Sequence, residues 1–173
     1  MAEVNTALRR KANKMPRKKT KSLVREVQPD RIYNSVPVQK LINRVMLDGK
    51  KQIAERHVYN GMQKAADKVK VQNPLEVFEK AIRNIQPHME TRSRRVGGAN
   101  YQIPFEVKGQ RQQHLTTMWF VAAARSKSGI GMEDRIANEL VDAFNNTGTA
   151  VRKKEDTHKM AEANRAFAHF ARY

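Results

Sequence analysis

One pair of glycines, Gly97-Gly98, separates two short segments of alternating polarity in a chain whose other segments repeat with the period of a helix. Arginines lie on the segment before the pair. Apolar side chains alternate along the segment after it, at Tyr101, Ile103, Phe105 and Val107. Two extended segments joined by a glycine pair are typical of a β-hairpin. The sequence therefore predicts one two-stranded ribbon at about residues 88–107, and because an isolated ribbon is marginal in water, part of it must pack on helices.

Amphipathic segments with helical period lie on both sides of the ribbon. Ser35 is a candidate N-cap for the first of them, and Asn73-Pro74 opens the third. Apolar residues recur three or four positions apart within each segment. We therefore predict a mainly α fold, a bundle of about six helices with a protruding two-stranded β-ribbon. The expected helices span about 36–47, 54–69, 74–86, 110–126 and 132–144, with the last within 150–170.

The chain has 173 residues, enough for one domain with a hydrophobic core. Residues 1–30 are basic and show no sustained apolar period, which is typical of a flexible arm that becomes ordered on binding. The letters MPRKK at residues 15–19 look like a second start, so residues 1–14 are a candidate extension. The sequence predicts a basic arm over 1–30 and a single helical domain over 31–173.

The chain is strongly basic, with 34 Lys and Arg residues against 17 Asp and Glu residues and a formal net charge of +17. Residues 1–25 contribute +8 of this charge, residues 92–111 contribute +4 and residues 150–173 contribute +3. Self-repulsion at such a charge destabilises an isolated fold, and a phosphate backbone is the commonest partner that compensates it. The charge pattern predicts a nucleic acid bound by the two ends of the chain and by the ribbon.

The sequence contains no cysteine, which excludes disulfides and thiolate metal sites. No apolar run approaches the length of a membrane span, and the N-terminal region lacks the apolar stretch of a secretory signal. We expect no membrane partner, and the lack of cysteine fits a reducing compartment such as the cytoplasm. The basic, acid-poor start also has some character of an organelle transit peptide, so a bacterial and an organellar origin both stay open.

No group of residues predicts catalysis. Glu155 and His158 have the Glu-x-x-His spacing of di-iron bundles, but such a site needs a second copy and two further glutamates on facing helices. The sequence has no second copy, which favours a structural histidine. The segment Gly129-Ile130-Gly131 lacks the third glycine and the preceding strand of a dinucleotide loop, which favours a turn between helices. We expect no enzyme, no cofactor and no metal.

The basic ribbon and tail each allow two interpretations. Arginines beside a glycine turn suit contacts to folded RNA, because guanidinium groups bind phosphate through several donors and stack on bases. Alternatively, the ribbon is a solvated turn whose charges discourage strand aggregation, and the tail serves solubility or localisation.

An architectural DNA-binding protein would also extend a basic ribbon, although the tip here, Val96 to Ala99, has no bulky apolar wedge. An RNA-processing enzyme would need an acid/base pair, which the sequence does not offer.

Four separated segments resemble, in the right order, the family of bacterial small-subunit ribosomal protein seven. They read MLDGKK at 46–51, PLEVFE at 74–79, SRRVGG at 93–98 with YQIP at 101–104, and VRKKEDTHKMAEANRAFAH at 151–169. The resemblance runs from about Met15 to Tyr173. It implies a helical bundle with a protruding β-ribbon, in agreement with the prediction from periodicity.

The resemblance also implies a function: a structural constituent of the small ribosomal subunit that binds 16S-type rRNA directly and nucleates assembly of the subunit head. Implied partners are neighbouring head and platform ribosomal proteins, with exit-site tRNA and the mRNA exit channel close to the ribbon. The matching positions imply these rRNA contacts: Arg17, Lys18 and Lys19 in the arm; Lys50 and Lys51 after the first helix; Arg92, Arg94, Arg95, Gly97 and Gly98 in the ribbon; Arg125 in the fourth helix; and Arg152, Lys153, Lys154 and His158 in the last.

Three stretches depart from the family pattern. Residues 1–14 have no counterpart in the usual start, and residues 110–113 keep only Arg111 where the family is often more basic. The final letters FARY also differ from the common tail. The resemblance therefore leaves rRNA contacts at residues 110–113 and in the tail open, and it does not extend to residues 1–14.

Overall fold

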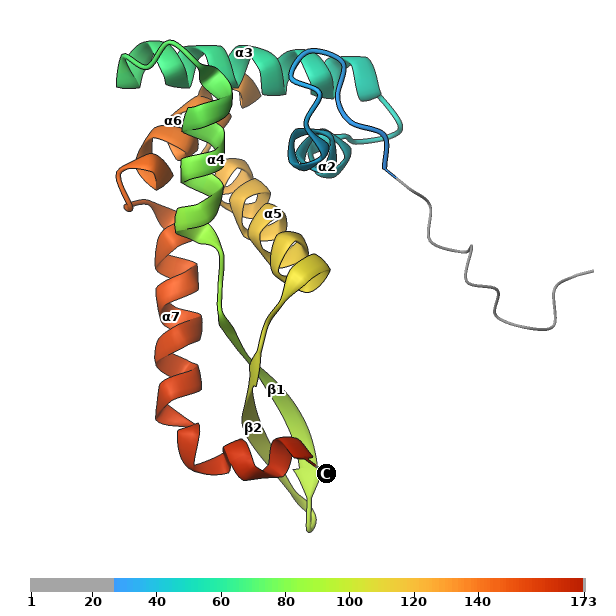
Figure 1. Ribbon diagram of the computed structural model, residues 1–173, viewed down its shortest axis with the longest axis vertical. Helices are drawn as coiled ribbons and strands as arrows, with labels where there is room; N and C mark the ends of the chain where they lie inside the picture. The colour runs from blue at the N-terminus through green and yellow to red at the C-terminus, as the bar shows by residue number, and fades with distance from the viewer. Residues whose placement is uncertain (1–26, 173) are drawn as a thin grey trace, which may run out of the picture.

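The structure, a computed structural model, describes residues 27–172 (Figure 1). Within these residues the chain forms six α-helices, one two-stranded antiparallel sheet and a 3-10 helix, which confirms the predicted mainly α fold with a ribbon. The elements are α2 (Val36–Val45), α3 (Lys51–Val69), α4 (Pro74–Ile85), β1 (Met89–Val96), β2 (Ala99–Glu106), α5 (Gly109–Ser126), α6 (Met132–Phe144), α7 (Thr149–Ala163) and η2 (Arg165–Arg172). None of the helices in this part of the chain has both the length and the apolar character needed to span a membrane.

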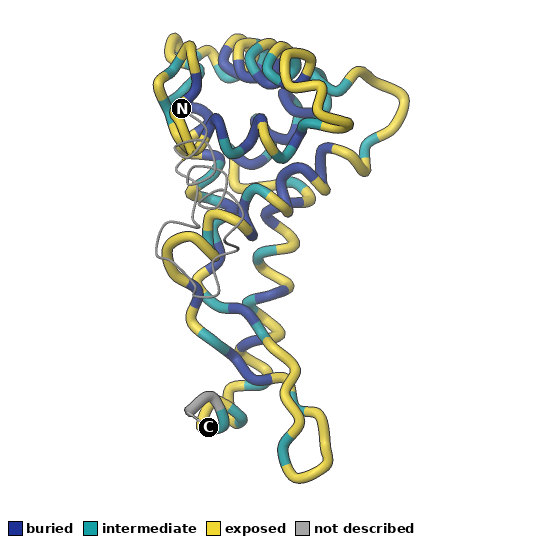
Figure 2. The backbone as a smooth tube through the Cα atoms, turned by 90° about the vertical axis from the view of Figure 1, so that its right-hand side faces the viewer, coloured by how far each residue is buried: buried dark blue, intermediate teal, exposed yellow. Residues whose placement is uncertain are grey.

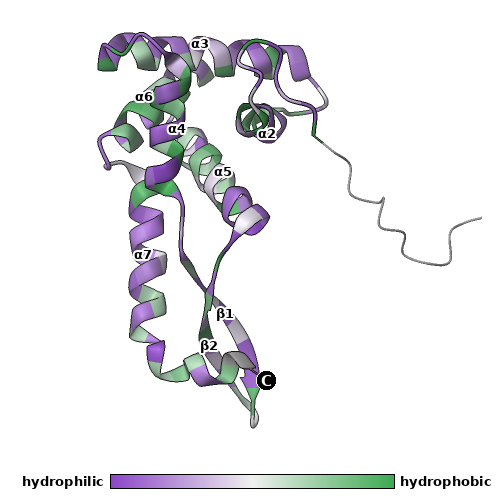
Figure 3. Ribbon diagram, in the orientation of Figure 1, coloured by the Kyte–Doolittle hydropathy of each residue, from purple (hydrophilic) through white to green (hydrophobic). Residues whose placement is uncertain are grey.

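The hydrophobic core lies in the helical body, where α3 crosses the other helices at the end remote from the ribbon (Figures 1 and 3). Each helix contributes the apolar stripe that its period predicts. Fully buried members come from five helices: Leu41, Ile42, Val58, Met62, Phe78, Ile85, Phe120, Ile136 and Leu140. Helices α3 and α6 approach closely at Gly61, where a Cβ atom would lie 2.8 Å from Ile136 Cγ2. This contact explains the glycine on an otherwise apolar helix face.

The two predicted helix starts are stabilised in different ways. Asn73 caps α4 as expected, because its Oδ1 accepts a hydrogen bond from Leu75 N at 3.0 Å. Ser35 occupies the N-cap position of α2, but its side chain makes no cap bond. Instead the buried carboxylate of Asp30 accepts hydrogen bonds from the backbone N–H groups of the turn before α2, at Ile32, Tyr33 and Ser35. Asp30, the last residue of the predicted arm, therefore packs with the body, and the arm's first 26 residues lie outside the described part of the chain.

The ribbon forms where the sequence predicts it. β1 pairs with β2 from Met89 opposite Glu106 to Val96 opposite Ala99, and Gly97 and Gly98 make the turn. Both glycines have positive φ, +58° and +92°, which a two-residue hairpin turn of the favoured kind requires. The ribbon extends from the body beside α7, and the loop at its far end is exposed (Figures 1 and 2).

The prediction of one continuous last helix is wrong. Helix α7 ends at Ala163, and the chain then turns across the ribbon as the separate 3-10 helix η2 (Figure 1). The side chain of Asn164 donates a hydrogen bond to the Met160 carbonyl at 2.7 Å and closes the last turn of α7. The turn brings Phe167 and Phe170 against Tyr101 of the ribbon, with ring centroids 5.0 and 5.6 Å away. Phe167 and Phe170, whose spacing is also typical of a continuing helix, therefore form the contact between η2 and β2.

Candidate nucleic-acid interface

The ribbon's three arginines lie on two faces. The register places Arg92 opposite Ile103 and Arg94 opposite Tyr101, so both share the face that η2 covers, while Arg95 lies opposite Asn100 on the other face. Arg94 is exposed, and its Nη1 donates a hydrogen bond to the carbonyl of Phe170 at 3.4 Å. Arg94 and Arg95 have no carboxylate partner among the described residues. They are the ribbon cations available to a phosphate.

Arg92 is different, because the buried carboxylate of Glu90 holds it. Arg92 Nε donates to Glu90 Oε1 at 2.6 Å, and Arg111 of α5 donates to Oε2 through Nε and Nη2 at 3.1 and 3.0 Å. Burial by itself would raise the pKa of Glu90, but the hydrogen bonds from Arg111 and Arg92 outweigh it and lower the pKa. Glu90 therefore ties the base of the ribbon to α5 and compensates part of the charge of both arginines.

The four site residues predicted on α7 also divide. Arg152 and Lys153 are exposed and have no carboxylate partner within residues 27–172. Lys154 turns inward, and its Nζ donates to the carbonyl of Asn84 at the end of α4, at 2.7 Å. His158 accepts a hydrogen bond at Nε2 from the backbone N–H of His88, at 3.0 Å, just before β1. Half of this cluster therefore faces solvent and half joins α7 to its neighbours.

We expect His158 to titrate below its ordinary value of 6.5, because burial lowers its pKa and the charges of Lys154 and His88 add to the effect. A histidine with a lowered pKa in the folded state stabilises the fold fully above the unfolded value, and this contribution is lost as the pH falls below about 6.5. Ring-proton NMR against pH measures the value directly. The stability advantage of the native chain over His158→Phe should also shrink between about pH 7.5 and pH 5.5. A titration midpoint at or above 6.5 would contradict this assignment.

The remaining described site residues lie around the loop between α2 and α3. Lys51 pairs with Glu55 one turn later, at 3.7 Å. Arg125 donates through Nη2 to the carbonyl of Val45 at 3.3 Å, at the end of α2. Lys50 and Arg125, far apart in sequence, line the same pocket. The predicted arm contacts Arg17, Lys18 and Lys19 lie outside the described residues.

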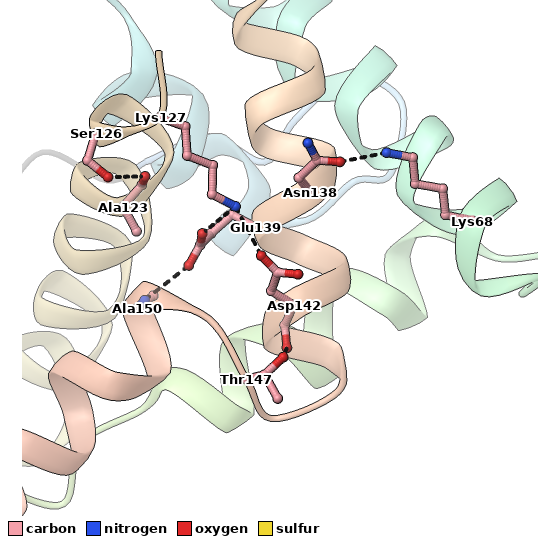
Figure 4. A network of polar contacts seen from close by, with 9 residues as sticks. All are labelled: Lys68, Ala123, Ser126, Lys127, Asn138, Glu139, Asp142, Thr147 and Ala150. Atoms are coloured by element: carbon pink, nitrogen blue, oxygen red, sulfur yellow. Dashed lines mark hydrogen bonds and ion pairs between the residues drawn. The ribbon is translucent and has the colours of Figure 1, made fainter. Parts of the chain in front are cut away.

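An ionic network around the buried carboxylate of Glu139 sets the position of α7 (Figure 4). Glu139 of α6 is fully buried, its Oε1 accepts the backbone N–H of Ala150 in the first turn of α7 at 3.0 Å, and its Oε2 lies 3.0 Å from Lys127 Nζ. Lys127 also lies 3.0 Å from Asp142 Oδ2. One carboxylate therefore anchors both the start of α7 and a lysine after α5.

Sequence reasoning did not assign roles to Glu90, Glu139 or Arg111. The positions of the two glutamates in the sequence pattern nevertheless indicate that both side chains face the interior. Glu90 alternates in phase with Arg92 and Arg94 and so belongs to the face covered by η2. Glu139 lies three residues after Ile136, on the apolar side of α6. Acidic residues at buried positions are rare unless paired, which marks such sites for inspection.

Exposed arginines and lysines on a ribbon and a helix, without a catalytic set, are the features of a basic nucleic-acid-binding protein. Within residues 27–172 no three His, Asp or Glu side chains gather where they could hold a metal. A comparison with protein families matches residues 16–165 to the family described as ribosomal protein S7p/S5e. The chain belongs to this family of ribosomal proteins.

Curated relatives support the same assignment over most of the chain. "Small ribosomal subunit protein uS7" of Thermosipho africanus is 58% identical over 147 residues, which cover 85% of this chain and 94% of the relative. The protein of the same name from Dictyoglomus turgidum is 56% identical over 146 residues, covering 84% and 93%. That of Lactococcus lactis subsp. cremoris is 55% identical over 153 residues, covering 88% and 98%. The resemblance found from four short segments is confirmed, and membership makes the chain a structural ribosomal protein rather than an enzyme.

Proposed function

We propose that this protein binds 16S-type rRNA directly and nucleates assembly of the head of the small ribosomal subunit. The observation that carries the proposal is the contrast, on the ribbon, α5 and α7, between cations that have a carboxylate partner and cations that have none. Glu90 compensates part of the charge of Arg92 and Arg111, whereas Arg94, Arg95 and the α7 pair of Arg152 and Lys153 have no carboxylate partner among the described residues. Unpaired, exposed cations gain most from phosphate, because binding releases counterions and breaks no internal ion pair.

The proposed rRNA contacts fall into groups of unequal accessibility. Exposed members are Lys50, Lys51, Arg94, Arg95, Arg125, Arg152 and Lys153. Gly97 and Gly98 would let the ribbon turn approach an RNA backbone, since a Cβ atom at either position would meet nothing within 4 Å. Arg92, Lys154 and His158 keep internal bonds and would contribute mainly by holding the other groups in place. Arg17, Lys18 and Lys19 complete the proposed set from the arm.

The exposed end of the ribbon supports a second part of the proposal, a position close to exit-site tRNA and the mRNA exit channel of the cytoplasmic ribosome (Figure 2). Neighbouring head and platform proteins would be the protein partners. The names of the relatives, which place those proteins in the small subunit, support this part as well.

The test is a competition between small-subunit rRNA and duplex DNA for the whole chain at physiological salt. We expect the rRNA to bind at least about 10³-fold more tightly than the DNA, the usual lower limit for specific over non-specific nucleic-acid binding. Fluorescence anisotropy with labelled rRNA and either competitor measures the ratio. Equal affinity for the two would refute the proposal and favour an architectural DNA-binding role, which also uses basic ribbons.

A further inference from the structure

A pocket of about 420 Å³ lies in the helical body. The helix ends that line it are at the end of the molecule remote from the ribbon (Figure 1). It is bounded by the end of α2, the loop to α3, the first turns of α3, the end of α5 and the start of α6. Its lining combines two kinds of side chain. The apolar members are Val45, Leu47, Ile53, Ala54 and Met132, and the polar members are Asp48, Lys50, His57, Arg125 and Arg135.

Three of the polar lining residues are cations without a carboxylate partner within the described residues: Lys50, Arg125 and Arg135. The two guanidinium groups are held by backbone carbonyls. Arg125 Nη2 donates to the Val45 carbonyl at 3.3 Å, and Arg135 Nε donates to the Ile130 carbonyl at 2.7 Å. Each guanidinium keeps further N–H donors for a ligand. The rim of the pocket therefore carries three positioned cations that can bind an anion, and one carboxylate, Asp48, offsets part of their charge.

The apolar side of the pocket is open to solvent. Leu47 is 61% exposed and Ile53 is 45% exposed, while Val45 and Ala54 behind them are buried. Large apolar side chains exposed beside three cations suit a ligand with a flat apolar part and an anionic part. His57 adds a ring of the kind on which bases stack. The volume lies near the lower end of the range for small-ligand pockets, which suits one nucleotide.

We propose that this pocket binds one unstacked nucleotide of the bound RNA, with the base against Leu47 and Ile53 and the flanking phosphates on Lys50, Arg125 and Arg135. The identity of that RNA rests on the function proposed above. Nucleic acid is favoured over a protein segment because the rim carries three cations against one acid, a charge that complements phosphates. Capture of a splayed-out base is also the usual way in which proteins recognise RNA loops. The pocket would then add recognition of a base to an interface that otherwise binds phosphate.

Methyl NMR of the full chain tests the pocket without reference to rRNA. The two probes are a single-stranded RNA hexanucleotide and an inorganic polyphosphate of equal charge. A base seated in the pocket shifts the methyl signals of Leu47 and Ile53 through its ring current, and the polyphosphate does not reproduce this shift. Equal shifts with both probes, or none with the hexanucleotide, would overturn the proposal and leave an anion-binding rim only.

Affinity for small-subunit rRNA tests the same pocket in its proposed setting. Ile53→Ala removes apolar contact and no charge, so we expect about tenfold weaker binding with an unchanged dependence on salt. Ile32→Ala is the matched control, an exposed isoleucine outside the pocket, and should bind as the native chain does. Lys50→Gln should weaken binding and also reduce the salt dependence by about one unit of slope.

Native affinity for rRNA from Ile53→Ala would overturn base capture and assign the apolar wall to another occupant, such as a neighbouring protein. Failure of the proposed function looks different. In that case the native chain would show no preference for rRNA over duplex DNA, while the methyl shifts with the hexanucleotide would persist.

Discussion

Replacing Glu139 by alanine is expected to lower the free energy of unfolding by about 3 kcal/mol, the lower end of the usual cost of breaking a buried charge pair, because Lys127 is only partly buried and keeps Asp142. Glu139 is 0% exposed, and its loss leaves Lys127 facing Asp142 alone and the N–H of Ala150 without its acceptor (Figure 4). Urea denaturation followed by circular dichroism measures the change. The midpoint should fall without a change in slope if the unfolded state is unaffected.

Glu133→Ala is the matched control on the same helix. Glu133 also pairs with a lysine, Lys64, at 3.0 Å, but this pair lies at the surface, where solvent screens it. We therefore expect little change in stability from this variant. Glu139→Gln separates the two roles of the buried carboxylate, because an amide oxygen can still accept from Ala150 N–H but carries no charge for Lys127. Little change in stability from Glu139→Ala, as from Glu133→Ala, would show that the network of Figure 4 does not stabilise the fold.

Neutralising four exposed cations of the ribbon and α7 together, chosen because none has a carboxylate partner among the described residues, is expected to have the largest effect on RNA binding. In the variant with Arg94, Arg95, Arg152 and Lys153 all changed to glutamine, rRNA affinity should fall about 10³-fold, at roughly 1 kcal/mol for each lost contact. The slope of log affinity against log salt should decrease by about three to four, because each phosphate contact releases about one counterion. Filter binding at several salt concentrations gives both quantities.

The matched control removes the same charge elsewhere, by changing exposed cations of α3, its C-cap and α4 to glutamine: Arg56, Lys68, Lys70 and Arg83. A general electrostatic attraction would make the two variants equally weak, and that result would contradict the proposed site. Circular dichroism should show a native helical spectrum for the ribbon and α7 variant, since none of its four residues is buried or ion-paired in the described chain. Unfolding of that variant would instead make the arginines structural.

Most of the fold could be predicted because its determinants are local. The cap at Asn73, the apolar period of each helix and the glycine turn at Gly97-Gly98 act within a few residues, and the structure has these elements where the sequence predicts them. The last helix could not be predicted in full. The contact of Phe167 with Tyr101 joins residues far apart in the chain, and spacing by three and four is equally typical of a continuing helix.

The candidate site was harder to predict because the partners of a charge are set by tertiary structure. Arg92 and Arg94 look alike in sequence, yet only Arg92 lies beside the buried Glu90. Lys154 and His158 lie on the same helix as Arg152 and Lys153, but both bond to groups 70 residues away. A count of basic residues therefore indicates candidate regions and overstates how many of their charges are free. The grouping of Lys50, Arg125 and Arg135 around one pocket has no signal in their spacing.

The turn that ends α7 changes the mechanics of the ribbon. α7 is fixed to the body at its start by Glu139 and at its middle by His158, and η2 then reaches from its end onto Tyr101 (Figure 1). The ribbon, α7 and η2 thus form a closed frame, in which the ribbon is held both at its base and at Tyr101 and is not an isolated hairpin. A braced element loses little conformational entropy when it binds, so more of its contact energy appears as affinity. Such a frame can also transmit a load applied near the ribbon to the helical body.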